Sequence, residues 1–510
     1  MGCRSWAERV RAYISSMPLD PRTPVIVGVG QHQQRVDDPL QSPTTAAFIA
    51  TAIRAAAADA GLSSLDAVDS LRVVQFLSWR YRDPARFIAA ELGISPRETG
   101  MTTNGGNSPQ SLVNTTALGI QAGRNDVVVL CGGETMRVRK RVRAMGIELP
   151  WPVVDESVVP QRMIGEELVM NHEIEISRKI WAPIQIYPMF ETAIRAASGR
   201  TPEEHMVHIS ELWSRFSHVA AGNPNAWLRT AVSPEEIRTV GPRNRMIGLP
   251  YPKLMNSNND VDQSAAIIMC SVEAAERLGI SRDRWVFPLA GTDCHEHNFV
   301  SERWEFTETP AIELGGKMVL DLAETAIDDI EIIDLYSCFP SAVQLGARAL
   351  GLSITQQLTR TGGLPFAGGP WNNYVMHAIA TVVGELRERP KEKGLIWANG
   401  GYTTKHAFGV YSAEPSPHGF RHAYPQDRID VLPRRTPVPI GASAGPATIE
   451  AYTVMHDRDG NPERAIAACR LPDGGRAWGD SEDAGVCAAM CEGEWVGRSV
   501  RLDDAGALLI

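Results

Sequence analysis

A glycine-rich turn between two apolar stretches places the tightest constraint on how this chain folds. The turn is Asn104-Gly105-Gly106-Asn107, and it opens a helix of small residues that runs to Gly123. An apolar strand follows from Asp126 to Glu134. A turn of this kind presents backbone N–H groups at a helix start, where they can hold an oxyanion or position a nucleophile. The plain alternative is a turn that only connects a strand to a buried helix.

The end of that strand carries a second signal. It reads Gly132-Gly133-Glu134-Thr135-Met136, and together with the turn it resembles the thiolase superfamily. In that superfamily the corresponding turn carries a catalytic cysteine. Here Gly105, Gly106 or Asn107 stands in its place. The resemblance therefore implies a thiolase fold without the nucleophile that takes the acyl group.

The composition is that of a globular protein with several cores. The chain has 510 residues, 44% hydrophobic and 22% charged, and this length predicts roughly two to four domains. A net charge of -10 argues against a general nucleic-acid binder, which needs a basic surface. Dispersed cysteines without a CxxC pair indicate reduced thiols in a cytoplasmic protein and no metal site. No apolar run reaches the ~18 residues of a membrane span.

The first core domain is predicted over 23–136 and 249–280, after an N-terminal appendage at 1–22. Strands at 24–31 and 71–76 flank an alanine-rich helix at 44–61, whose small side chains indicate close packing. This order argues for a layered α/β fold. Gly28 and Gly30 lack the third glycine of a dinucleotide fingerprint, so we interpret them as a structural turn.

Residues 137–248 resemble the loop domain that thiolases insert into the first core domain. In that family the insertion supplies most of the coenzyme A site. The segment opens on the basic run Arg137-Val138-Arg139-Lys140-Arg141-Val142-Arg143. Arg and Lys make charge-assisted hydrogen bonds to phosphates, so the run suits the phosphates of CoA. A solvated charged face explains the run equally well.

A polar loop after the insertion leads into the apolar strand at 265–270. The loop is similar to a thiolase segment, and this similarity implies that Asn258 and Ser264 contact the pantetheine of CoA. Lys253 is the nearby cation. Taken singly, each of these residues fits a backbone-capping role better than ligand contact.

Residues 281–430 repeat the theme as a second core domain. Strands at 285–291, 330–335 and 394–401 alternate with helices. A duplicated core is the thiolase architecture, with five layers in the order α-β-α-β-α and two central helices that meet at the active site. The expected fold class is therefore α/β.

Three motifs in this half correspond to the thiolase catalytic motifs, and each is altered. Asp334-Leu335-Tyr336-Ser337 ends a buried strand and offers Tyr336 as a phenol that donates or transfers a proton. A core aromatic is the alternative. Gly368-Gly369-Pro370 has glycine where thiolases have the activating histidine, and Asn372 at the next helix start becomes a binding candidate.

The third motif, Trp397 to His406, stands where thiolases carry a second cysteine, and Asn399 takes that place. His406 is the neighbouring group that titrates near neutrality. We expect Tyr336, His406 and Asn399 to be catalytic, and the turn residues with Asn372 to bind substrate. A structural histidine is the alternative for His406.

The tail at 440–510 changes class. A strand at 447–455, a turn at 457–461 and a second strand at 465–471 indicate a small β-barrel. The tail resembles the OB-type addition of mycobacterial thiolase-like proteins of type 1, which are related to sterol-carrier thiolases. It has no basic aromatic stripe, which favours a lid or partner-docking role over oligonucleotide binding.

Two functional hypotheses follow from the missing thiols and histidine. In the first, the protein is an enzyme of lipid or sterol acyl-CoA metabolism that makes or breaks a carbon–carbon bond without an acyl-enzyme, as a retro-aldolase does. In the second, it is a non-catalytic CoA-binding module or a subunit of a complex. Both take CoA or acyl-CoA as ligand and require no other cofactor. An acyltransferase assignment rests on fold analogy alone, and monomer, homodimer and a partner at the C-terminal domain stay open.

Overall fold

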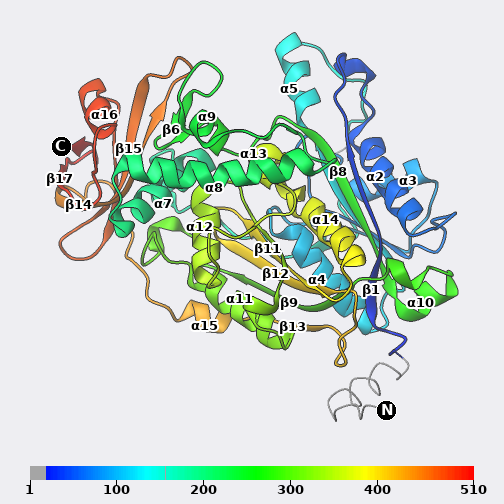
Figure 1. Ribbon diagram of the computed structural model, residues 1–510. Helices are drawn as coiled ribbons and strands as arrows, with labels where there is room; N and C mark the ends of the chain where they lie inside the picture. Colours follow the sequence, from blue (N-terminus) through cyan, green and yellow to red (C-terminus); the bar gives the residue numbers. More distant parts are fainter. Residues whose placement is uncertain (1–18, 155–156) are drawn as a thin grey trace, which may run out of the picture.

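Three β-sheets organise the computed structural model, which describes residues 19–154 and 157–510 (Figure 1). The predicted appendage therefore lies outside the described residues except for its last four positions. The first sheet has the order β1-β8-β4-β2-β3-β5. Its strands are β1 (Pro24–Gln33), β8 (Asp262–Ser271), β4 (Val127–Thr135), β2 (Ser70–Val73), β3 (Glu98–Thr102) and β5 (Met163–Ile164).

The second sheet repeats part of the first. It has the order β10-β11-β12-β9-β13, with β10 (Ile332–Leu335), β11 (Lys393–Gly400), β12 (Lys405–Ser412), β9 (Phe287–His295) and β13 (Arg421–Ala423). Along β2-β4-β8-β1 the pairings are parallel, antiparallel and antiparallel. Along β10-β11-β12-β9 they follow the same pattern. The predicted duplication is therefore confirmed.

Two helices lie between these sheets. They are α4 (Ser108–Gln121) and α14 (Tyr374–Glu388), and each packs on strands of both sheets (Figure 1). Helices α2 (Thr45–Asp59) and α3 (Pro84–Leu92) cover the outer side of the first sheet, and α11 (Pro310–Leu322) and α12 (Pro340–Ala349) cover that of the second. These are the five layers that the sequence predicts.

Close packing of α2 on β1 explains the first glycine pair. A side chain at Gly28 would meet the Ala56 carbonyl oxygen at 2.2 Å, and one at Gly30 would meet the Ala52 carbonyl oxygen at 2.2 Å. Both glycines lie inside β1 rather than in a turn. Our interpretation as a turn was wrong, because the constraint is the approach of the alanine-rich helix and not a reversal of the chain.

The inserted segment reaches into two sheets. Its basic run forms α5 (Met136–Met145), β5 pairs with the edge of β3, and β6 (Met246–Gly248) pairs with both β7 (Tyr251–Pro252) and the third sheet. Since β5 covers the edge of β3, that edge is closed to a second chain over the paired residues. The remaining helices of the insertion are α6 (Glu173–Ser177), α7 (Pro183–Ser198), α8 (Pro202–Gly222) and α9 (Pro234–Arg238).

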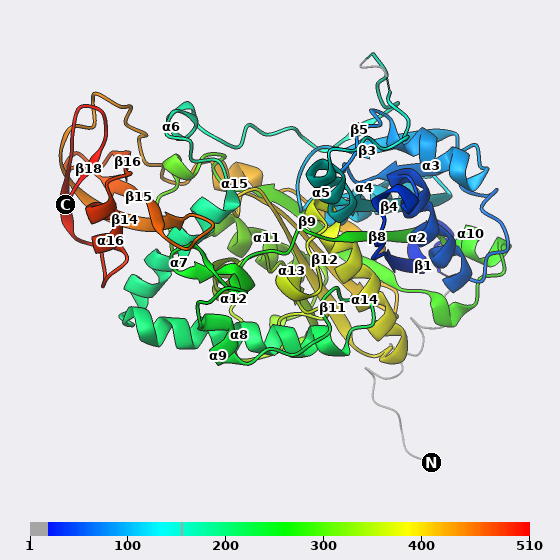
Figure 2. The ribbon, with the colours of Figure 1, turned by 90° about the horizontal axis from the view of Figure 1, so that it is seen from above.

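The third sheet forms one end of the molecule, opposite α2, α3 and α10 (Val272–Arg277) (Figure 2). Its order is β16-β15-β14-β17-β18, and a single bridge between Asp480 and Ala507 links its two ends. The elements are β14 (Gly445–His456), β15 (Pro462–Arg470), β16 (Arg476–Ser481), α16 (Ala484–Met490), β17 (Ser499–Leu502) and β18 (Leu508–Leu509). The predicted hairpin at 447–471 is confirmed, and the OB-type assignment stays a prediction.

Short helices complete the second half: α13 (Gly363–Phe366), before α14, and α15 (Gln426–Asp430), before the third sheet. Among the described residues, no helix is long and apolar enough to cross a membrane.

Candidate functional site

The glycine-rich turn lies where the sequence places it, directly before α4. Asn107 is the residue preceding the helix, and the Ser108 side chain donates to the carbonyl of Thr103. The Asn107 side chain does not cap the helix. It donates to Ser111 at 3.2 Å, and its buried Oδ1 has no partner among the described residues. No side chain caps this helix start, but Ser108, Gln110 and Ser111 donate to the carbonyls of Gly105 and Asn107, and Pro109 has no N–H. The amides of the turn itself, at 105–107, are therefore the ones left for a ligand.

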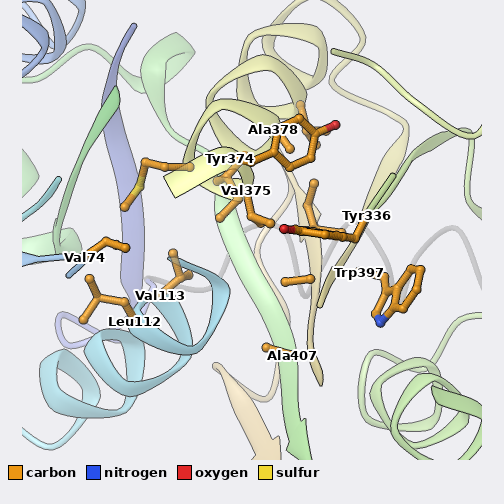
Figure 3. Close-up of a cluster of buried hydrophobic side chains, with 14 of the residues drawn as sticks. Val74, Leu112, Val113, Tyr336, Tyr374, Val375, Ala378, Trp397 and Ala407 are labelled. Atoms are coloured by element: carbon orange, nitrogen blue, oxygen red, sulfur yellow. The ribbon is translucent and has the colours of Figure 1, made fainter. Parts of the chain in front are cut away.

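Gly106 faces Tyr336. A side chain at this position would lie 2.7 Å from the Tyr336 hydroxyl and 2.4 Å from the carbonyl oxygen of Asn399. Glycine thus lets a phenol and a strand end approach the turn. Burial, followed by nearby Cys338 and Tyr187, raises the pKa of Tyr336 well above 10. Tyr336 is therefore a protonated phenol, and it lies in the same buried cluster as Val113 of α4 and Trp397 of β11 (Figure 3).

Gly105 faces Lys405. A side chain at Gly105 would lie 2.8 Å from the Lys405 Nζ, and this Nζ donates to the carbonyl of Asn104. Lys405 is only 8% exposed. The two glycines of the turn therefore each make room for one ionisable side chain from the second core.

Neighbouring positions on β12 face opposite sides of the sheet, as strand geometry requires. Gly409 lies against Gln110 of α4, whereas Phe408 packs on Gly315 of α11. Lys405 shares the α4 side with Gly409, and His406 shares the other side with Phe408. The structure therefore directs Lys405, rather than the predicted His406, toward the turn.

His406 is buried behind the strand. Its ring packs on Trp397 with centroids 5.9 Å apart, and its Nδ1 accepts from the Trp397 indole at 3.3 Å. The Nε2 has no partner among the described residues. Burial, followed by Arg303 and His295, holds the pKa of His406 well below 6.5. The ring is therefore a neutral imidazole with one nitrogen unused.

Asn399 lies on the same side as His406 and contacts a residue that sequence reasoning missed. Its amide donates to the Tyr187 hydroxyl at 2.9 Å, and that hydroxyl donates to the Gly401 carbonyl at 3.0 Å. Tyr187 comes from α7 of the insertion. Nothing in its local sequence distinguishes it from a core aromatic, so only the fold identifies it as the contact that holds the end of β11.

The remaining predicted residues divide into two groups. Asn372 belongs to the turn, because its amide donates to Asn104 Oδ1 at 2.8 Å and to the Gln75 carbonyl at 2.9 Å. The backbone of Asn258 is hydrogen-bonded to Leu364 and Gly369. Ser264 is fully buried in β8, and its hydroxyl donates to the Phe48 carbonyl. The side chain of Lys253 is exposed. These three show capping and packing contacts rather than a shared ligand site.

A cavity of about 360 Å³ adjoins the turn. Asn107, Lys405 and His406 belong to its wall, and so does Asp293 at the end of β9. The Asp293 carboxylate accepts from Asn114 at 2.8 Å and is hydrogen-bonded to His422 at 2.7 Å, and the Ser111 hydroxyl also donates to it. Asp293 was missed, although an acidic residue followed by Cys294 and His295 at the end of an apolar strand was a readable signal.

A separate cleft of about 680 Å³ holds part of the basic run. Arg139 lines it together with Arg80 and Arg82, beside the aromatic side chains of Trp79 and Tyr81. Arg139 also donates to the Leu77 carbonyl. Other members of the run are engaged elsewhere, since Lys140 pairs with Asp260 at 2.9 Å. Over residues 19–154 and 157–510, no cluster of acidic, histidine or cysteine side chains could hold a metal ion.

Comparisons with known proteins place these features in a family. Residues 427–507 match the family described as "Thiolase-like protein type 1 additional C-terminal domain". A monomeric SCP2-thiolase-like protein type 1 from Mycobacterium smegmatis superposes with a TM-score of 0.82 and 31% identity, over 97% of this chain and 100% of that one. No curated protein matches the chain in sequence.

More distant structures share the fold alone. The Ltp2-ChsH2(DUF35) aldolase matches with a TM-score of 0.60 and 19% identity, over 78% of this chain and 99% of that one. Human mitochondrial 3-ketoacyl-CoA thiolase matches with a TM-score of 0.57 and 15% identity, over 77% of this chain and 100% of that one.

Proposed function

The chain belongs to the SCP2-thiolase-like proteins of type 1, and from this membership we propose that it binds CoA or an acyl-CoA and cleaves or forms a carbon–carbon bond without an acyl-enzyme. The observation that carries the proposal is the approach of the Tyr336 hydroxyl to the uncapped turn at Gly106. Backbone N–H groups at a helix start stabilise negative charge that develops on a carbonyl oxygen. A thioester oxygen at the turn would thus meet both the amides and a phenol.

The ligand class has support from the arginine cleft. Arg80, Arg82 and Arg139 line it beside Trp79 and Tyr81. Guanidinium groups suit the phosphates of CoA, and aromatic faces suit its adenine. Gln75 lines this cleft too, and its carbonyl bonds to Asn372, which bonds to Asn104 of the turn. The cleft and the turn are therefore connected through a chain of two hydrogen bonds.

Acyl transfer through a thiolate has no support at the turn. No cysteine stands at positions 104–107. Cys338 follows Tyr336 by two residues, and burial raises the pKa of its thiol to about 12. Such a thiol stays protonated near neutral pH and is a poor nucleophile.

In the proposed cleavage of a 3-hydroxyacyl-CoA, a base removes the hydroxyl proton, the bond between C2 and C3 breaks, and C2 is protonated. The protonated Tyr336 phenol would stabilise the enolate and supply the proton. The neutral His406 carries its ring proton on Nε2, because Nδ1 accepts from the Trp397 indole, so we assign Nε2–H a hydrogen bond to the thioester oxygen, and solvent accepts the hydroxyl proton. No redox cofactor is needed, because the step only exchanges protons.

The test combines binding and turnover. Calorimetric titration with CoA and acetyl-CoA should show binding, and mass spectrometry of a mixture with 3-hydroxyacyl-CoA should show acetyl-CoA and the released carbonyl compound. Tyr336→Phe and His406→Gln should each abolish product and leave CoA binding intact. Tyr374→Phe is the matched control, since this buried phenol lies beside Tyr336 with ring centroids 5.6 Å apart. Full turnover in both test variants would disprove the assigned roles.

One observation favours the non-catalytic alternative, a CoA-binding module. Tyr336 is only 8% exposed and does not line the cavity beside the turn. In that case CoA binds, no acyl-CoA is converted, and all three variants behave alike. Absence of CoA binding would remove both candidates.

A further inference from the structure

Lys405 is a buried amine that the proposed function does not use. It is 8% exposed, and its Nζ donates to the Asn104 carbonyl. Within the described parts of the chain, no carboxylate forms an ion pair with it. Lysine is almost never buried to this degree without a counter-ion. A side chain that only holds the turn through the Asn104 carbonyl would not need an ionisable amine at position 405.

The surroundings of Lys405 weaken the preference of its amine for the charged form. Burial lowers the pKa of Lys405, and the Glu167 carboxylate opposes that shift. The Nζ also lies at the start of α4, where the helix dipole is positive and repels an ammonium. A neutral lysine amine in an apolar site is a nucleophile toward carbonyl carbon.

The geometry leaves this amine open on one side. Lys405 is part of the wall of the 360 Å³ cavity, whose other walls include the apolar side chains of Leu112, Ile164 and Leu168. In its deprotonated form, an amine that donates one N–H to Asn104 still has its lone pair. The missing side chain at Gly105 is also required, because a Cβ there would lie 2.8 Å from Nζ and 2.9 Å from Cε.

We propose that Lys405 is the nucleophile of a second site in this cavity, which binds a small apolar aldehyde or ketone as an imine. The amine nitrogen attacks the carbonyl carbon, one proton moves from nitrogen to oxygen, and water leaves as the C=N bond forms. No oxidant or reductant takes part. The cavity shares Asn107 and His406 with the acyl-CoA proposal, but Lys405 has no role in that proposal, so labelling at Lys405 and acyl-CoA turnover test the two proposals separately.

Reductive trapping tests the proposal on the unaltered full chain. Butanal and sodium cyanoborohydride at pH 7 convert an imine into a stable butyl-lysine, which peptide mapping locates. Lys317, exposed on α11, is the internal control. Because the cavity holds the aldehyde beside the Lys405 amine, we expect Lys405 to be labelled at least about tenfold faster. Equal or slower labelling of Lys405 would overturn the proposal.

Two further measurements separate a binding site from a merely reactive lysine. The labelling rate at Lys405 should saturate with butanal concentration, whereas a linear dependence would show that no carbonyl compound is held. Gly105→Ala should slow labelling at Lys405 and leave Lys317 unchanged, because the new methyl group displaces the amine without removing it. Unchanged labelling in Gly105→Ala would contradict the geometry on which the site rests.

Discussion

At the scale of single residues, the conformation of the turn requires glycine, because its neighbours leave no space for a Cβ atom. Gly106 has no room for a side chain, since a Cβ would lie 2.4 Å from a backbone oxygen of Asn399 that belongs to a buried strand. A strand carbonyl cannot rotate away as a flexible side chain can. The turn, Tyr336 and β11 must therefore move together if anything is added here.

We predict that Gly106→Ala lowers the free energy of unfolding by about 1–3 kcal/mol, the range for overpacking a buried site. Urea unfolding would measure it. Gly384→Ala is the control, because this glycine lies inside α14 with no atom within 4 Å of an added Cβ, and it should gain about 1 kcal/mol from helix propensity. Equal effects at both positions would show that the turn is not tightly packed.

At the scale of elements, a buried carboxylate fixes the start of α5. Asp262 Oδ1 accepts from the backbone of Arg137 at 3.0 Å and of Val138 at 3.3 Å. Its Oδ2 is buried without a partner among the described residues. Burial therefore raises the pKa of Asp262 from 3.8 to about 6.

This shift predicts a pH dependence of stability. The folded state holds the proton more tightly, so the contribution of Asp262 is full below pH 3.8 and is lost as the pH rises through about 6. Asp262→Asn keeps the accepting oxygen and cannot ionise. Its stability relative to the wild type should therefore rise between pH 4 and pH 7, by up to about 3 kcal/mol.

Urea unfolding of both proteins at the two pH values measures this difference. Asp459→Asn, at an exposed position in the turn between β14 and β15, is the matched control, and the change in its relative stability should be smaller than that of Asp262→Asn. If Asp262→Asn has the same stability relative to the wild type at pH 4 and pH 7, burial does not raise the pKa of Asp262.

At the scale of the whole molecule, one arginine attaches the third sheet to the second core. Arg476 is fully buried. It donates to Glu450 at 2.8 Å within its own sheet and to the Val300 carbonyl at 3.1 Å across the interface. The Arg178 guanidinium links the insertion to the third sheet, through the Trp478 carbonyl at 3.1 Å.

Arg476→Met should destabilise the protein by about 3–5 kcal/mol, because it breaks a buried ion pair with Glu450 and leaves that carboxylate only the more distant, half-exposed Arg470. Limited proteolysis should then cut between α15 and β14 faster than in the wild type. Arg470→Met is matched to it, since Arg470 contacts the same Glu450 at 3.7 Å but is 45% exposed. That change should remove only about 0–1 kcal/mol, and equal proteolysis of the two variants would exclude Arg476 as the anchor.

The sequence by itself determined the elements and their order. The predicted strands at 24–31, 126–134 and 394–401 lie within two residues of β1, β4 and β11. They follow from local pattern, as do the alanine-rich α2 and the glycine turn before α4, because hydrophobic period and turn chemistry act over a few residues. The repeated order of strands in the two halves also followed from the sequence, and with it the layered fold.

Only the tertiary structure decided which side chains meet. Lys405 contacts Asn104, which lies 301 residues away in the sequence. The alternation of side chains along β12 predicts two faces of the strand, but it does not predict which face packs against α4. In the folded protein Gly409 packs against α4 and Phe408 packs against α11, and this packing decides which face of β12 lies toward the turn. The local sequence around Ser264 predicts a polar loop, but the structure buries Ser264 fully, and its hydroxyl donates to the Phe48 carbonyl. Contacts between distant segments are set by packing, which no local pattern encodes.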